Sequence, residues 1–145
     1  MMIAQAYLAV GPRADLGRIA KALIRIVRLA SREEMYVILT SIASLARSHP
    51  DLFRPYYKTF FVYASDPVFI RNVKLEIIAS LADKSISSIV MQELKDYVRS
   101  PEKDLVVQTI QVMGRIGAAV PDLADEVLGV LMALISSKNG KCIGV

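Results

Sequence analysis

The sequence predicts an all-α fold, a HEAT/armadillo-type α-solenoid of antiparallel helix hairpins that is open at both ends. The main observation is a five-position pattern that occurs three times, at intervals of 36 and 35 residues. Within each copy the members lie at i, i+3, i+4, i+6 and i+7, which places them on one face of a helix. The large apolar members, predicted to form the repeat core, are Leu39, Ile42 and Leu45, then Leu75, Ile78 and Leu81, then Ile110, Met113 and Ile116.

A second observation is that each copy also carries two small residues three positions apart. They are alanines in the first two copies and Gly114 and Gly117 in the third. A glycine inside a helix costs about 1 kcal/mol relative to alanine, so its presence requires a reason. The shared position predicts close helix packing at these glycines rather than a phosphate-binding role.

The individual helices follow from their start and stop signals. A helix that ends near Val10 is stopped by glycine and proline, and Ser31 with Glu34 forms a capping box for the third helix. Asp66 is expected to cap the fifth helix, with Pro67 at its first position. The short connections predict antiparallel neighbours. The expected helices are 3–10, 15–30, 31–48, 53–62, 66–82, 87–98, 100–120 and 121–136.

The predicted organisation is one partial solenoid over residues 1–137, with about four hairpins of which the first is incomplete, and a non-repeat tail at 138–145. A spacing near 35 residues also fits tetratricopeptide repeats. Those repeats need tryptophan, glycine and tyrosine at set positions, whereas this chain has no tryptophan and has glycine in the third copy alone. The HEAT/armadillo class is therefore the better fit.

Composition excludes several classes of function. A formal charge of +4 over 145 residues is too small to predict nucleic-acid binding. The uncharged run 127–137 is too short for a membrane span, and the start lacks the features of a signal peptide. The single cysteine, Cys142, suits a reducing cytosol. With His49 as the one histidine, the sequence predicts neither a metal site nor a nucleophile with its base, so we expect no enzyme and no cofactor.

Two surface features are candidates for binding. Basic residues lie at i, i+3, i+7 and i+10 of the second helix, in one sector away from its apolar stripe. This row is either a face for an acidic partner or anionic membrane headgroups, or a solvated face. An aromatic run at 53–63 is either a peptide-binding groove or, as we expect from its spacing, packing between hairpins. The basic row consists of Arg18, Lys21, Arg25 and Arg28.

Several of these segments together resemble a known family. The chain is similar to the trunk of a β-adaptin from residue 4 to residue 137, and motifs such as Phe53-x-Pro55-Tyr56-x-Lys58 and 97–100 are most like the β subunit of adaptor protein complex 3. The β subunits of the clathrin-associated complexes 1 and 2 share less of it and remain the alternative. The segments that carry the resemblance are 53–62, 65–67, 73–82, 93–98 and 109–117.

The resemblance implies a structural subunit of a heterotetrameric vesicle-coat adaptor in intracellular protein transport, from Golgi or endosomes to lysosomes or vacuoles. It implies three partner subunits (a second large, a medium and a small one) and a response to Arf-family GTPases. It also implies a cytoplasmic location, with peripheral contact to Golgi or endosomal membranes through the complex. No cargo-binding residue is transferred by it.

Two further expectations concern completeness and the competing class of function. Compared with a β-adaptin trunk, the chain begins inside a hairpin and ends where another repeat is expected, so it resembles a fragment. The competing function is a free-standing armadillo-type receptor for a peptide or a transport partner. Such receptors line their groove with recurrent asparagine or tryptophan, and Asn72 and Asn139 do not recur at the repeat spacing.

Overall fold

The computed structural model describes residues 13–139, and this part of the chain is helical with no strand. The chain folds into two compact units, one that ends at Leu81 and one that begins at Ala82. The all-α prediction is confirmed. The helix expected at 3–10, the end of the tail and Cys142 lie outside the described residues.

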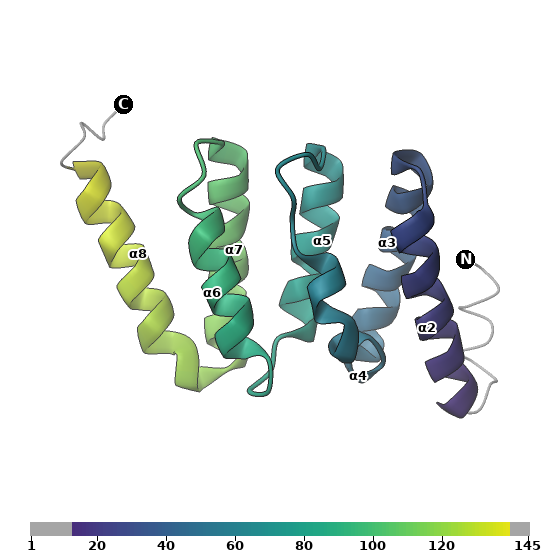
Figure 1. The fold of residues 1–145 in the computed structure, drawn as a ribbon. Coiled ribbons are helices and arrows are strands. Elements are labelled where there is room, and N and C mark those ends of the chain that lie inside the picture. The colour runs from purple at the N-terminus through teal and green to yellow at the C-terminus, as the bar shows by residue number, and fades with distance from the viewer. Residues whose placement is uncertain (1–12, 140–145) are drawn as a thin grey trace. The chain divides into compact units, whose positions relative to one another are not determined.

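The first unit is built on three main helices, α2 (Arg13–Leu29), α3 (Arg32–Ser48) and α5 (Val68–Leu81). Only two residues join α2 to α3, so the two helices lie antiparallel, and α3 packs along α5 (Figure 1). Between α3 and α5 the chain forms the short α4 (Pro50–Phe53) and the 3-10 helix η1 (Arg54–Phe60). The core of the unit contains fully buried side chains from all of these elements except α2, whose own stripe is buried almost as deeply.

The start of α3 is set by local sequence. Ser31 is the N-cap, its hydroxyl oxygen accepts a hydrogen bond from the Glu34 backbone N–H at 3.4 Å, and the Glu34 carboxylate accepts one from the Ser31 N–H at 3.1 Å. This reciprocal arrangement satisfies two amide donors that a helix start leaves without partners. The predicted capping box is confirmed, and it fixes the turn between α2 and α3.

The prediction of a single helix at 53–62 is wrong. Pro55 lacks the N–H that a continuous α-helix would need, and Tyr56 departs from helical geometry with φ −107° and ψ 20°. The chain therefore forms one α-helical turn followed by a 3-10 segment. Phe53 and Phe60 are completely buried, which supports packing rather than an open aromatic groove.

The expected role of Asp66 as the cap of α5 is also wrong. The carbonyl of Pro67 accepts the first helical hydrogen bonds, from the N–H groups of Ile70 and Arg71 at 3.0 Å. The Asp66 carboxylate instead accepts from the Tyr63 N–H at 2.9 Å and from Lys74 Nζ at 2.7 Å. A longer-range charge partner has displaced the local capping interaction, and the lysine is 3% exposed.

The second unit contains α6 (Ser87–Tyr97), α7 (Lys103–Ala119), the 3-10 turn η2 (Pro121–Leu123) and α8 (Ala124–Asn139). α7 packs against both α6 and α8, and an ion pair between Lys95 and Glu126 at 2.6 Å joins α6 to α8. The last helix continues three residues beyond its expected end at 136.

The repeat-core residues of the first two copies are all buried, at 0 to 4% exposure. In the third copy Met113 and Ile116 are fully buried, whereas Ile110 is half-buried. Thr109 takes the fully buried position instead, and its hydroxyl is satisfied by donating to the Leu105 carbonyl at 2.7 Å. The core stripe of α7 is thus shifted by one residue at this turn.

The close-packing explanation fails for Gly114. A methyl group at this position would meet no atom within 4 Å, and at Gly117 it would meet Val127 at ordinary contact distances of 3.4 to 3.7 Å. Within the described chain, helix packing does not require glycine in place of alanine at either position. The second glycine merely borders α8.

We therefore expect Gly114→Ala to stabilise the chain by about 0.5–1 kcal/mol, because alanine lowers the entropic cost of the helix without a clash. Urea unfolding followed by circular dichroism measures this change. The matched control is Gln111→Gly in the exposed part of the same helix, which should lose about as much. A loss of stability in Gly114→Ala would contradict the open space around this residue.

Candidate partner-binding surface

The basic row predicted from the sequence lies on α2, and all four of its side chains belong to exposed residues. α2 buries the opposite stripe, which includes Leu16, Leu23 and Val27, against the first unit. Arg18 stands apart from the other three because it pairs with Asp15 at 3.9 Å, and its side chain is 85% exposed. A pair this long and exposed contributes little to stability.

The other three basic residues of the row line a hollow of about 250 Å³. We call it the basic hollow, and Tyr56 of η1 forms part of its wall. Arg28 is held in place because its Nη2 donates to Thr59 Oγ1 at 3.1 Å. None of the described residues that line it is acidic. The residues that line the basic hollow are Lys21, Ile24, Arg25, Arg28, Leu29 and Tyr56.

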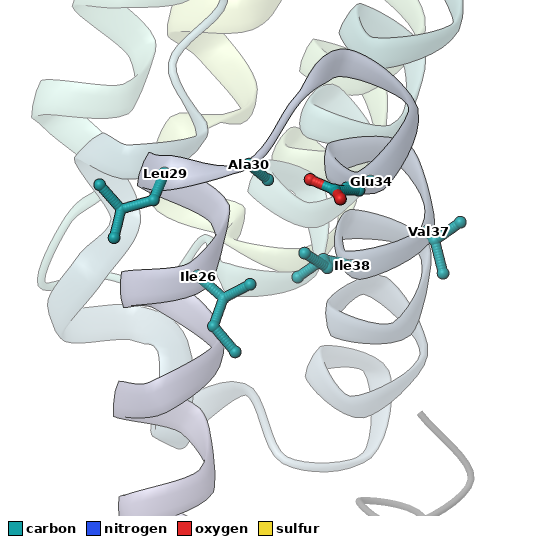
Figure 2. Close-up of a pocket in the computed structure, with 6 residues that line it drawn as sticks. All are labelled: Ile26, Leu29, Ala30, Glu34, Val37 and Ile38. Atoms are coloured by element: carbon teal, nitrogen blue, oxygen red, sulfur yellow. The ribbon is translucent and has the colours of Figure 1, made fainter.

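A larger hollow of about 560 Å³, which we call the apolar hollow, lies between α2 and α3. Figure 2 shows Ile26 and Ile38 extending toward each other from the two helices, whereas Leu29 extends outward from α2. Leu29 is 82% exposed and lines both hollows, so it forms a ridge between them. The residues that line the apolar hollow are Ile26, Leu29, Ala30, Glu34, Val37 and Ile38.

Arg28 also lines a third hollow, of about 340 Å³. Lys58 and Lys74 also line it, but the Lys74 charge is already balanced by Asp66 at 2.7 Å. Lys74 also donates to the Phe61 carbonyl at 3.3 Å and lies 4.7 Å from the centre of the Tyr63 ring. This lysine is therefore part of the folded framework, and Arg28 and Lys58 are the cations that the third hollow presents.

The sequence thus placed the basic row correctly on one exposed face, but it did not show the two hollows. Tyr56 belongs to the predicted aromatic run but was not expected beside the basic row, because it comes from η1, far along the chain from α2. Leu29 was missed although a signal existed: Ala22, Ile26 and Leu29 form a second apolar stripe, at i, i+4 and i+7, outside the core stripe of α2.

The chemistry available at this surface is recognition by charge and by apolar contact. Within residues 13–139 there is no cluster of three side chains suited to a metal ion. The same part of the chain contains no helix with the length and hydrophobicity required to cross a bilayer. Guanidinium and ammonium groups beside an apolar hollow can bind carboxylates or phosphates together with an aliphatic or aromatic group.

Paired helices and a repeat of about 35 residues define a helical-repeat protein of the HEAT class. The sequence model of a protein family, the adaptin N-terminal region, matches residues 1–143. The chain belongs to this family. Adaptins are non-enzymatic subunits of coat adaptors.

Individual relatives agree with the resemblance predicted from the sequence. The chain is 35% identical over 139 residues to the AP-3 complex subunit beta-1 of Mus musculus, covering 96% of this chain and 12% of the relative. It is 37% identical over 139 residues to the AP-3 complex subunit beta-2 of the same species, covering 96% and 13%. Identity to the mouse AP-1 complex subunit beta-1 is 29% over 123 residues, covering 85% and 13%. The chain thus spans about one eighth of the length of these relatives.

Proposed function

We propose that this chain is part of the trunk of a β-type large subunit of a heterotetrameric vesicle-coat adaptor. Its role there is that of a structural scaffold in transport from Golgi or endosomes to lysosomes or vacuoles. The observation that carries the proposal is the adaptin match over nearly the whole chain. Within one species, Mus musculus, the identity is higher to the two AP-3 β subunits, 35% and 37%, than to the AP-1 β subunit, 29%, and this favours the AP-3 type over the clathrin-associated complexes.

The partners we propose are a second large subunit, a medium subunit and a small subunit, with regulation by an Arf-family GTPase. Contact with Golgi or endosomal membranes would be peripheral and made through the complex, from the cytoplasmic side, and nucleic acid is not among the partners. We further propose that residues 1–137 are consecutive repeats of one partial solenoid and that 138–145 are a non-repeat tail. The repeat spacing across both units supports this organisation.

The assembly role can be tested by placing an affinity tag on this chain at its own gene locus and purifying it under native conditions. We expect mass spectrometry to recover one further large, one medium and one small adaptor subunit. The control is the same tag on a chain carrying Ile78→Asp, which removes a fully buried core residue and should recover none of the three.

Recovery of transport cargo or of nuclear-transport proteins without any adaptor subunit would contradict the proposal. That outcome would favour the free-standing armadillo-type receptor. Recovery of AP-1 or AP-2 subunits in place of AP-3 subunits would keep the scaffold role but reassign the complex.

A further inference from the structure

We propose that the paired basic and apolar hollows on α2 bind an acidic peptide segment of a partner protein. The peptide would place a bulky aliphatic or aromatic side chain in the apolar hollow and its carboxylates over Lys21, Arg25 and Arg28. This inference goes beyond the assembly role proposed above and does not depend on it. It assigns a binding site and the chemistry of its ligand.

The first argument is that the two hollows form one continuous surface. Leu29 lines both of them, and at 82% exposure it is the most exposed large apolar residue among those described. Ile26 and Val37, which also line the apolar hollow, are 48% and 58% exposed. A ligand that covers Leu29 therefore removes apolar surface from water on one side and meets cations on the other.

The second argument is charge complementarity. Lys21, Arg25 and Arg28 line the basic hollow, and no acidic side chain lies among its described lining residues. The Arg28 guanidinium is oriented by Thr59, which reduces the conformational freedom it would lose on binding. Cations beside an apolar hollow favour a ligand that is anionic next to a hydrophobic group, because each part then meets its complement.

The third argument distinguishes a peptide from an anionic membrane. The opposite edge of the apolar hollow is the first turn of α3, which carries Glu33 and Glu34, offset in part by Arg32. A flat anionic bilayer that reached Leu29 would also meet these carboxylates. A peptide can present its acidic groups to α2 alone and keep them away from the first turn of α3.

The test uses the full chain as bait for a displayed library of short random peptides. We expect the enriched peptides to combine Asp or Glu with a nearby Leu, Ile, Met or Phe. Their affinity should fall about tenfold or more in Lys21→Glu with Arg25→Glu, and also in Leu29→Ser, and it should weaken as salt is raised.

Matched controls separate this site from general effects of charge and hydrophobicity. Arg99→Glu with Lys103→Glu makes the same change in formal charge at exposed residues of the second unit. Leu128→Ser makes the same change as Leu29→Ser at a leucine that is 58% exposed. Both controls should bind the selected peptides as tightly as the original chain does.

Four results would overturn the proposal. The first is enrichment of neutral or basic peptides, or of peptides whose binding ignores the α2 variants. The second is binding to vesicles of phosphatidylcholine and phosphatidylserine, lost in the α2 variants, with no acidic peptide enriched. The third is a dimer in sedimentation that Leu29→Ser dissociates, since a second copy would then occupy the surface.

The fourth concerns folding. Because Leu29 is exposed, Leu29→Ser should leave the midpoint of thermal unfolding within about 2–3 °C of the original value. A much larger fall would show that this leucine is buried by the chain's own residues. The surface would then belong to the fold and not to a partner.

Discussion

Replacing Ile78 with aspartate should unfold the first unit. Ile78 lies in α5, is 1% exposed, and belongs to the stripe that includes Leu75 and Leu81. An unpaired carboxylate at this depth loses its hydration and finds no charge partner among apolar neighbours, at a cost of several kcal/mol even if it takes up a proton. Because a domain is stable by only about 5–15 kcal/mol, we expect the cooperative melting transition of this unit to be lost.

Circular dichroism during heating and during urea unfolding measures the effect. The control is Val68→Asp in the first turn of the same helix, where the side chain is 44% exposed and a carboxylate is favoured by the helix dipole. It should change stability by less than about 1 kcal/mol. An unchanged melting curve for Ile78→Asp would mean that the buried stripe of α5 is assigned to the wrong residues.

The second large effect is expected from Lys74→Met, which removes one partner of a buried ion pair. The lysine side chain is 3% exposed and that of Asp66 is 12% exposed, with 2.7 Å between the charged atoms. The variant leaves the Asp66 carboxylate poorly solvated, and breaking such pairs costs about 3–5 kcal/mol. The hydrogen bond to the Phe61 carbonyl is lost as well.

A double-mutant cycle identifies the cause of this loss. Lys74→Met combined with Asp66→Asn keeps an acceptor for the Tyr63 N–H but removes the uncompensated charge, so it should be more stable than Lys74→Met alone. The exposed pair between Lys84 and Asp122, 3.3 Å apart, provides the comparison. Lys84→Met should cost no more than about 1 kcal/mol. Equal losses at the two lysines would contradict the importance of burial.

Features that depend on a few neighbouring residues could be predicted from the sequence. The capping box at Ser31 and Glu34 is one, because all of its hydrogen bonds join residues within one turn. The basic row is another, because helical periodicity alone brings its members to one face. The three-fold pattern identified the buried stripes of α3 and α5 for the same reason.

Features that depend on distant residues could not be predicted. Asp66 has the local sequence of a helix cap, but its carboxylate pairs with Lys74, eight residues along the chain, in a buried ion pair. Thr109 can occupy the buried position of α7 because its hydroxyl donates a hydrogen bond within its own helix, and the apolar pattern does not show this. The basic hollow needs Tyr56 and Thr59 of η1 beside α2, and no periodicity in α2 shows which segment will pack there.

The segment formed by α4 and η1 has a consequence for local motion. Its backbone hydrogen bonds are of poorer quality than those of an α-helix, because η1 has 3-10 geometry and Tyr56 departs from helical dihedral angles. Its side chains are anchored in the first unit, since Phe53 and Phe60 are completely buried and Arg54 donates to the Leu81 carbonyl at 2.9 Å. Amide protons in this segment should therefore exchange with solvent without release of the aromatic anchors. Tyr56 and Thr59 lie between these anchors, so the exchange rates of their amide protons measure directly how firmly this wall of the basic hollow is held.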